Sequence, residues 1–461
     1  MAEASIETTL ELWASSLRDV KGRIHTLFGQ KRVAASAGQF LDGLLGNEPR
    51  KTGWMRAEAA GDPGPWRQQA ILGRGRWDAD ALRDIVRDYA LETLADKDAV
   101  LVIDETGFLK QGKASCGVAR QYTGSAGKIT NCQIGVFACY VSRHGHAFID
   151  RALYLPKEWT DDRARLKAAH VPKTVGFATK PQIARRMITS AIAAKVPFSF
   201  VAADSVYGTG EIETALRKAG KGYVLGVACN HVFHSWGKKQ MVGGTAAKIA
   251  QTLPKNAWRR LSAGEGTKGP RLHDWAYLEL ADLDAGQYNS ALTGEWTRGL
   301  LIRRNIADGD LAFFSTWCPK DTPMKKLVSV EGHRWAIEDS FEAAKNELGL
   351  DHNETRSWHG KDGQAKAKLY FHFVPNVSRL PDGVRVHRAG CGECCAKFPT
   401  NHGYASNAPA RRYGASASHC NEGHWAGRVG DHRRAAVPHK RHPAPRRQCD
   451  ASATPRPMLG G

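Results

Sequence analysis

The spacing of apolar residues along the chain changes from a helical period to short apolar runs near residue 96. Before that point, Leu10, Trp13, Leu17 and Val20 begin a helical spacing that continues to about residue 45. A second amphipathic stretch starts near residues 77–80 and continues to about residue 94. The pattern predicts a helical N-terminal domain over residues 1–95.

Almost wholly apolar runs dominate the next segment, residues 96–228. Residues 99–104 and 198–204 each form such a run and each ends in an Asp, as expected of central strands. The segment alternates between strand and helix patterns, which is typical of α/β proteins. The other predicted elements are strands over 132–141, 146–155 and 223–227, and helices over 180–195 and 211–219.

The remainder of the chain divides into three parts. Residues 229–324 contain short strand-like pieces, and we interpret them as a β-rich insertion. Helical spacing returns over residues 325–348, within a last structured segment 325–360. Residues 361–461 are poor in Leu, Val and Phe, lack Ile and carry more than half of the net positive charge, so we expect a disordered basic tail.

The overall charge favours a polyanionic partner. Lys and Arg number 66 against 46 Asp and Glu, giving a net charge of +20 and a pI near 9.6. Such a surface attracts nucleic acid, although charge alone does not separate DNA from RNA. No run approaches the roughly 20 apolar residues that cross a bilayer, and no secretory signal pattern starts the chain. We therefore expect no membrane association and a cytoplasmic location.

Three acidic residues occupy positions that favour metal chemistry. Asp104 and Asp204 each end an apolar strand, and Glu338 lies on a late helix. A carboxylate at the end of a central strand loses hydration, which costs free energy unless a cation or hydrogen bonds compensate it. Two Mg²⁺ or Mn²⁺ ions about 4 Å apart in such a cluster would promote phosphodiester chemistry. A single Asp after a strand is more often a turn former, so the prediction depends on the three acids together.

The helix around Glu338 carries a charged stripe. Arg334, Glu338, Phe341 and Lys345 follow at i, i+4, i+7 and i+11, on one face. Arg334 and Lys345 therefore flank the carboxylate and are candidates for binding substrate phosphates. The alternative is a solvated ion pair on the helix surface.

Several long segments resemble bacterial insertion-sequence transposases of the DDE type. They are VLVIDETGFLKQGKASCGVARQYTGSAGKITNCQIGV (100–136), RALYLPKEW (151–159), VAADSVYG (201–208) and HRWAIEDSFEAAKNELGLDHNETRSWHG (333–360). The resemblance extends from about residue 15 to residue 360. It implies an RNase H-like core, a mixed sheet flanked by helices, with a largely β insertion before the last catalytic helix. It also implies that Asp104, Asp204 and Glu338 are the three catalytic acids.

The resemblance includes a family signature of Tyr, Arg, Glu and Lys around the third acid. Arg334, Glu338 and Lys345 match this signature, whereas Glu331 stands where the Tyr is expected. We therefore do not assign to Glu331 the role that the family's Tyr would have in binding the end of the element.

Further residues near the first two acids are candidates for DNA contact. Tyr207 and the basic, Gly-rich loop from Arg120 to Lys128 are candidates for contacting phosphate or a flipped base. The alternatives are a core aromatic and a plain connection. Lys110, Lys113 and Arg120 are expected to line a DNA track.

Two interpretations of the C-terminal tail remain. After residue 360 the resemblance predicts an apolar helix, but a Cys-, His-, Arg- and Pro-rich sequence follows, which is typical of an out-of-frame translation of a GC-rich gene. In that case the core lacks a packing partner, and the activity of this copy is impaired. The alternative is a zinc site, with Cys391, Cys394 or Cys395 and with His402, His424 or His432 as ligands.

Together these observations predict a DNA transposase that cleaves the ends of an insertion sequence and joins the 3′ hydroxyls to target DNA. Its partners would be terminal inverted repeats, bound by the N-terminal helices, and target DNA. We expect a homodimer in the DNA complex and a location at the bacterial nucleoid. The alternatives are a hydrolysing nuclease with the same core and an impaired remnant that only binds DNA.

Overall fold

The computed structural model describes residues 6–73, 77–235, 241–266, 269–280, 294–352 and 358. The predicted tail, including its possible zinc ligands, lies outside the described residues. None of the described helices has the length and apolar character needed to cross a lipid bilayer.

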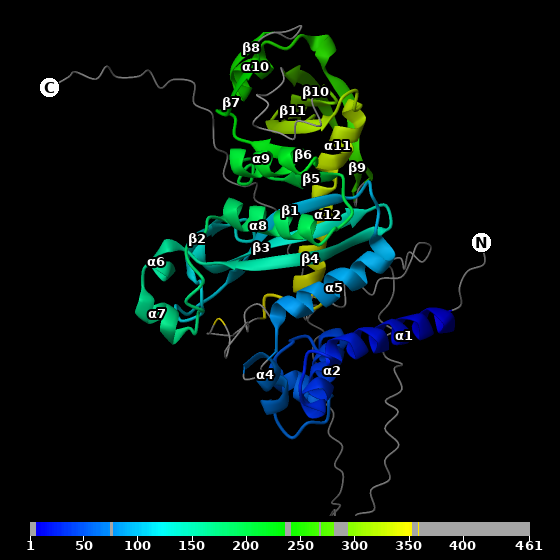
Figure 1. The fold of residues 1–461 in the computed structure, drawn as a ribbon, viewed down its shortest axis with the longest axis vertical. Coiled ribbons are helices and arrows are strands. Elements are labelled where there is room, and N and C mark those ends of the chain that lie inside the picture. Colours follow the sequence, from blue (N-terminus) through cyan, green and yellow to red (C-terminus); the bar gives the residue numbers. More distant parts are fainter. Residues whose placement is uncertain are drawn as a thin grey trace, which may run out of the picture. The chain divides into compact units, whose positions relative to one another are not determined.

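The segment before the first strand folds as helices, as the apolar spacing predicts (Figure 1). Asp78 begins the last of them, because its carboxylate accepts hydrogen bonds from the backbone N–H groups of Asp80 and Ala81, at 2.8 and 3.1 Å. This helix packs on the sheet, whereas the preceding helices mainly contact one another. The helices are α1 (Ile6–His25), α2 (Lys31–Leu45), α3 (Gly53–Ala59), α4 (Trp66–Gly73) and α5 (Ala79–Leu94).

Within the described residues, ten strands form one mixed sheet in which β1, β5 and β6 are parallel neighbours. The strand order is β2-β3-β1-β5-β6-β12-β11-β10-β9, with β4 paired to β3. This arrangement confirms the predicted mixed sheet, in which β1 and β4 both pair with β3. The strands before the insertion are β1 (Val100–Leu109), β2 (Ala119–Thr123), β3 (Lys128–Ser142), β4 (Gly145–Tyr154), β5 (Phe200–Ala203) and β6 (Gly222–Val227).

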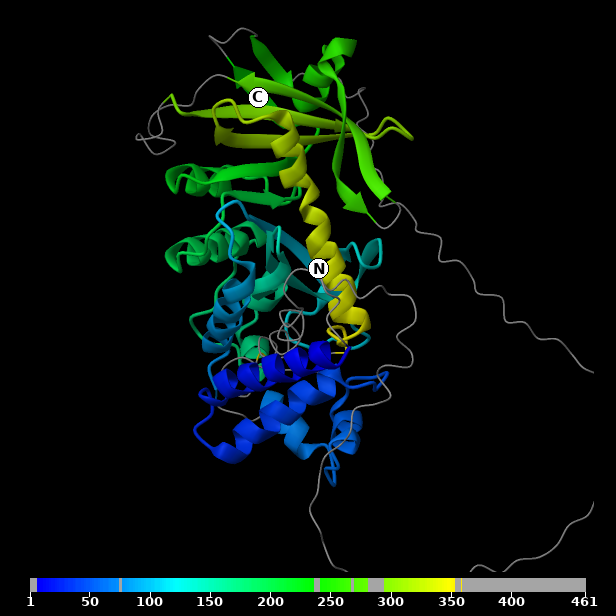
Figure 2. The ribbon, with the colours of Figure 1, turned by 90° about the vertical axis from the view of Figure 1, so that its right-hand side faces the viewer.

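Helices cover both faces of this sheet (Figure 2). On one face lie α5, α8 (Lys180–Ala193) and α9 (Gly210–Lys218). On the other face lie α11 (Met324–Gly332) and α12 (Arg334–Asn346). Two short helices, α6 (Lys157–Thr160) and α7 (Arg163–Ala168), follow β4. The fold is therefore the α/β class expected from the sequence.

The segment between β6 and α11 is rich in strands, and most of them extend the central sheet. β12 pairs antiparallel with β6, so the sheet continues from the core into the insertion without a break. A separate pair, β7 and β8, packs with α10 in a second apolar cluster. The elements are β7 (Val232–Ser235), β8 (Val242–Thr245), α10 (Ala246–Gln251), η1 (Lys255–Ala257), β9 (Arg259–Gly266), β10 (Gly269–Leu280), β11 (Trp296–Arg304) and β12 (Leu311–Pro319).

Two local features differ from the sequence-based expectation. The predicted Gly-rich loop contains β2, which forms a hairpin with β3, so the segment from Arg120 to Lys128 is not a plain connection. The single helix predicted over residues 325–348 is divided at His333 into α11 and α12. His333 has φ −62° and ψ −18°, which is close to helical geometry. His is not a helix-breaking residue, so its type did not predict the break between α11 and α12.

Candidate functional site

The first two predicted acids lie at the same edge of the sheet. β1 and β5 are parallel, and their last paired residues are Ile103 and Ala203. Asp104 and Asp204 each follow directly, where β1 and β5 end their pairing. Asp204 follows the end of β5 as predicted, but Asp104 does not end its strand, because β1 continues to Leu109 by pairing with β3. One carboxylate oxygen of Asp204 accepts a hydrogen bond from the Val206 backbone N–H at 2.9 Å, which fixes the turn after β5.

The surroundings of these carboxylates oppose their negative charge. Burial raises the pKa of Asp104 to about 7, and the charge of Asp204 adds to this rise, whereas Arg334 lowers it. Burial also raises the pKa of Asp204, again against the lowering effect of Arg334. The two groups therefore need a nearby positive charge in order to be ionised together.

Arg334 supplies positive charge to both carboxylates from the first residue of α12. Its Nε is buried and has no hydrogen-bond partner in the described part of the chain. An Arg side chain next to two acids and only partly satisfied is well placed to bind an incoming anionic group, such as a DNA phosphate.

Glu338 lies one turn beyond Arg334 on α12, but its side chain is exposed. Its charge acts on Arg271 of β10, and the structure does not gather it with the two Asp residues. Among the described residues, no group of three His, Cys, Asp or Glu is arranged to hold a metal ion. The assignment of Glu338 as the third acid therefore stays a prediction.

The donor set of the Asp pair nevertheless suits a divalent cation. Two desolvated carboxylates that repel each other are stabilised by a shared positive charge, and hard oxygen ligands are those that Mg²⁺ and Mn²⁺ prefer. Asp104 and Asp204 are thus the residues that fit the metal implied by the sequence.

The predicted DNA-contact residues divide into exposed and buried groups. Lys113 and Arg120 are exposed, and Lys110 is partly exposed. Tyr207 has no exposed surface, and its hydroxyl donates to Glu105, which favours the alternative role of a core aromatic. The Lys345 ammonium donates to the Thr106 hydroxyl at 2.6 Å, so it attaches α12 to β1.

Glu331, which stands where the family signature has Tyr, forms an ion pair with the insertion. Its carboxylate accepts from Arg303 of β11 at 2.7 Å, and Glu331 is only 4% exposed. The change of residue type is therefore matched by a cation from the neighbouring strand, and this position attaches α11 to the insertion.

Sequence reasoning did not identify Glu105 and Lys180 as part of this site. Glu105 follows Asp104 in β1, and its carboxylate accepts from both Lys180 and Tyr207. Strand alternation could have placed Glu105, because consecutive residues of a strand point to opposite faces of the sheet. Asp104 faces the α12 side near Arg334, and Glu105 therefore faces the α8 side, where Lys180 begins the helix.

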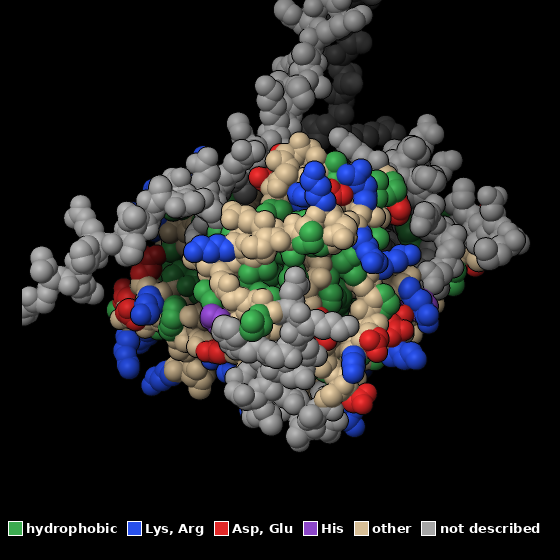
Figure 3. All heavy atoms as spheres, turned by 90° about the horizontal axis from the view of Figure 1, so that it is seen from above, with side chains coloured by type: hydrophobic (Ala, Val, Ile, Leu, Met, Phe, Trp, Pro, Cys, Tyr) green, Lys and Arg blue, Asp and Glu red, His purple; other side chains and the backbone are tan. Residues whose placement is uncertain are grey.

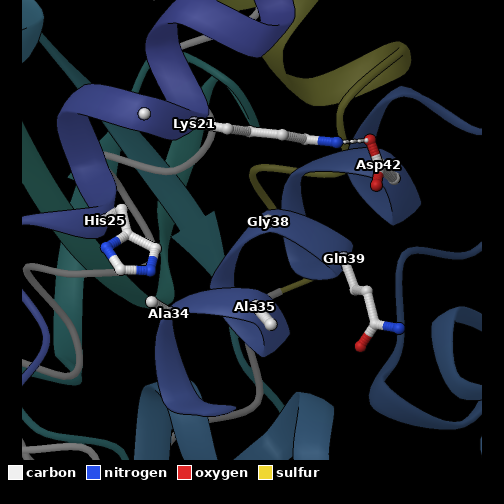
Figure 4. Close-up of a pocket in the computed structure, with 8 residues that line it drawn as sticks. Lys21, His25, Ala34, Ala35, Gly38, Gln39 and Asp42 are labelled. Atoms are coloured by element: carbon white, nitrogen blue, oxygen red, sulfur yellow. Dashed lines mark hydrogen bonds and ion pairs between the residues drawn. The ribbon is translucent and has the colours of Figure 1, made fainter. Parts of the chain in front are cut away.

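A separate groove lies between α1 and α2, away from the acids (Figure 4). Ala34, Ala35 and Gly38 form its small-residue wall, and Lys21 and Asp42 pair at one end at 2.5 Å. Because this cation is already paired within the groove, the groove does not resemble a site for an anionic ligand.

Comparisons with known proteins agree with the fold. The family profile described as DDE superfamily endonuclease matches residues 23–269, and that described as Transposase DDE domain matches residues 179–369. The first match covers more than half of the chain and includes Asp104 and Asp204. The mixed sheet flanked by helices defines an RNase H-like core. The chain belongs to the DDE superfamily of endonucleases.

One curated relative and one solved structure extend the comparison. The chain is 31% identical over 163 residues to the probable transposase for insertion sequence element IS701 of Microchaete diplosiphon. That match covers 35% of this chain and 40% of the relative, so the chain spans less than half of the relative's length. The NurA nuclease from Sulfolobus solfataricus is similar over 55% of this chain and 81% of its own, at 8% identity and a TM-score of 0.25. So weak a structural likeness carries no argument about function.

Proposed function

We propose that the chain is a transposase that cuts the ends of a mobile DNA element and joins the freed 3′ hydroxyls to target DNA. The observation that carries the proposal is the pair Asp104 and Asp204, desolvated and mutually repelling at the shared edge of two parallel strands, within the electrostatic reach of Arg334. Membership of the DDE superfamily and the similarity to a probable insertion-sequence transposase support it.

In this proposal Asp104 and Asp204 hold two Mg²⁺ or Mn²⁺ ions, and Glu338 completes the ligand set. When bound, the ions activate the attacking oxygen and stabilise the departing oxygen of a phosphodiester. Glu338 lies one helical turn from Arg334, whose charge acts on both Asp residues, and the proposal requires the Glu338 carboxylate to move toward them.

The chain's own cations position the DNA. Arg334 would bind the phosphate next to the scissile bond, because its charge acts on both acids and its buried Nε has no hydrogen-bond partner among the described residues. Lys113 and Arg120, exposed around the β2–β3 hairpin, would contact phosphates further along the backbone. The partners in this proposal are the terminal inverted repeats, target DNA and a second copy of the chain in the DNA complex.

The direct test is Mg²⁺-dependent nicking of supercoiled plasmid DNA that carries the element's ends. We expect Asp104→Asn, Asp204→Asn and Glu338→Gln each to reduce the nicking rate by at least about a hundredfold, as expected when a metal ligand is lost. Glu342→Gln is the matched control, because Glu342 is an exposed carboxylate one turn beyond Glu338 on the same helix. Nicking that persists in both Asp variants would contradict the proposal.

Strand transfer separates a transposase from a hydrolysing nuclease. Supplied with an oligonucleotide that ends in a 3′ hydroxyl and with target plasmid, the protein should join the two. Nicking without joined product would instead identify a nuclease with the same core. Binding of DNA with neither product would identify an impaired remnant.

A further inference from the structure

We propose that the hydrogen bond from Tyr207 to Glu105 sets the separation of Asp104 and Asp204, with Lys180 holding the other carboxylate oxygen of Glu105. This makes Tyr207, Glu105 and Lys180 positioning residues for the divalent-ion site. The inference rests on the proposed function, because it concerns the two acids that would hold the ions.

The bond joins the two segments that carry the acids. Glu105 follows Asp104 directly in β1, and Tyr207 lies three residues after Asp204 in the turn that follows β5. The Tyr207 backbone N–H also donates to the Asp204 carbonyl at 3.1 Å, so its side chain and Asp204 belong to one rigid turn. A movement of either acid-bearing segment would therefore stretch the bond between Tyr207 and Glu105.

Both oxygens of the Glu105 carboxylate have a hydrogen-bond partner in this arrangement. One of its oxygens accepts from the Tyr207 hydroxyl and the other accepts from the Lys180 ammonium. Lys180 is the first residue of α8, which a capping box between Thr179 and Gln182 holds in place. Because both oxygens have partners on the α8 side of the sheet, Glu105 acts as a fixed attachment point rather than as a spare metal ligand.

The other side of the same turn rests directly on the backbone of β6. A Cβ atom at Gly226 would lie 2.7 Å from the Ser205 nitrogen and 2.8 Å from the Asp204 carbonyl carbon. A Cβ atom at Gly208 would lie 1.9 Å from the Gly226 carbonyl oxygen. The turn therefore has two supports: close backbone contact with β6, and the hydroxyl of Tyr207 toward β1.

Rigid support matters here because the two carboxylates repel each other. The pairing of β1 and β5 ends at Ile103 and Ala203, so beyond it contacts such as that of Tyr207 with Glu105 oppose the repulsion. Without that contact the two carboxylates separate more widely, and an ion shared by both binds less well. Residues that orient metal ligands typically contribute about tenfold to a hundredfold in metal affinity.

The test is Mn²⁺ binding to the full-length protein, followed through the electron paramagnetic resonance signal of the free ion. We expect Tyr207→Phe to weaken Mn²⁺ binding by about tenfold or more, since Phe keeps the buried ring but removes the hydroxyl. Competition with Mg²⁺ should show an altered preference between the two ions, a result that general destabilisation alone does not produce. Glu105→Gln keeps an acceptor for Tyr207 and should have a smaller effect.

The chain offers a matched control at the other end of the same two strands. The Tyr140 hydroxyl donates to the Pro197 carbonyl at 2.6 Å and accepts from the Asp96 backbone N–H at 2.8 Å, joining the segments that precede β5 and β1. Tyr140→Phe should lower the unfolding midpoint in urea about as much as Tyr207→Phe does, but leave Mn²⁺ affinity unchanged.

The outcomes separate this inference from the proposed function. If the unmodified protein binds no Mn²⁺, or if Asp104→Asn and Asp204→Asn bind it normally, the proposed metal site fails. If those controls behave as expected but Tyr207→Phe binds Mn²⁺ with unchanged affinity, the positioning role is refuted. Equal losses of affinity in Tyr207→Phe and Tyr140→Phe would also refute it, since they would indicate general destabilisation.

Discussion

Asp104 is held in surroundings that oppose its ionisation, and this costs folding free energy. Burial and the neighbouring Asp204 raise its pKa to about 7, and Arg334 compensates only in part. Residues that serve chemistry are often unfavourable for stability in this way, so their removal stabilises the fold while activity is lost.

We expect Asp104→Asn to raise the free energy of unfolding by about 1–2 kcal/mol at pH 8 without divalent ions. The Asn amide has nearly the same shape as the carboxylate but lacks its desolvated negative charge. For a chain of this size the unfolding temperature should rise by a few degrees. Differential scanning calorimetry with and without saturating Mg²⁺ measures both states. Mg²⁺ should stabilise the unmodified protein but not the variant.

Glu342→Gln is again the control, and it should change the unfolding temperature little under either condition, because Glu342 is exposed. A lower unfolding temperature for Asp104→Asn would show that the carboxylate stabilises the metal-free fold, contrary to this account.

At this scale the sequence predicted the apolar runs that precede Asp104 and Asp204, but the prediction that Asp104 ends a strand was wrong, because β1 continues to Leu109 by pairing with β3. The network that holds the two acids was not predicted. Asp104 and Asp204 follow apolar runs, and that pattern is visible in one sequence. The turn that Asp204 forms with Val206 was open to prediction, because an Asp after a strand is often a turn former. The contact of Tyr207 with Glu105 was not, because it joins residues far apart in the chain. The same holds for Lys345, whose contact with Thr106 joins residues far apart in the chain.

Among the elements, the junction of α11 and α12 is held by the insertion. Arg271 of β10 donates to the carbonyls of Ala263 and Gly332, both at 2.8 Å, and so joins β9 to the end of α11. A Cβ atom at Gly332 would lie 1.7 Å from the Ala263 carbonyl oxygen. The insertion thus sets the position from which α12 presents Arg334 and Glu338.

We expect Gly332→Ala to destabilise the protein by about 1–3 kcal/mol, because the added methyl group forces α11 away from β9. Gly22→Ala in α1 is the matched control, since no heavy atom lies within 4 Å of a Cβ placed there. That substitution should stabilise the protein by about 0.5–1 kcal/mol. Urea unfolding of both variants measures the difference, and equal effects of the two substitutions would contradict this role for Gly332.

The local spacing of apolar residues predicted most helices and strands of the core. It did not predict which distant strands pair with each other. The strands of the insertion were expected, but their continuation of the central sheet depends on the contact of β12 with the free edge of β6. That edge is defined only after the core has folded. The β2 strand was missed because its five residues lie between glycine-rich turns.

For the molecule as a whole, DNA binding depends on where the net charge of +20 is located on the surface. Seen from the end that carries β7 to β12, Lys and Arg lie mostly toward the margins and are mixed with Asp and Glu (Figure 3). Lys113 and Arg120 are exposed near the hairpin next to the acid-bearing strand β1. Lys195 and Lys218 are also exposed, but they follow α8 and end α9, at the opposite edge of the sheet from the acids.

The pair Lys113 and Arg120 and the pair Lys195 and Lys218 test whether DNA binds along the edge of the sheet that carries the two acids. Each phosphate contact that is lost reduces the slope of log affinity against log salt by about 0.9. We therefore expect the double variant Lys113→Gln/Arg120→Gln to reduce the slope by about 2, and Lys195→Gln/Lys218→Gln to leave it unchanged, although both remove two positive charges. Fluorescence anisotropy with a labelled duplex over a range of KCl concentrations measures the slopes. If both variants lower the slope equally, the DNA responds to net charge alone, and the proposed track along the hairpin is wrong.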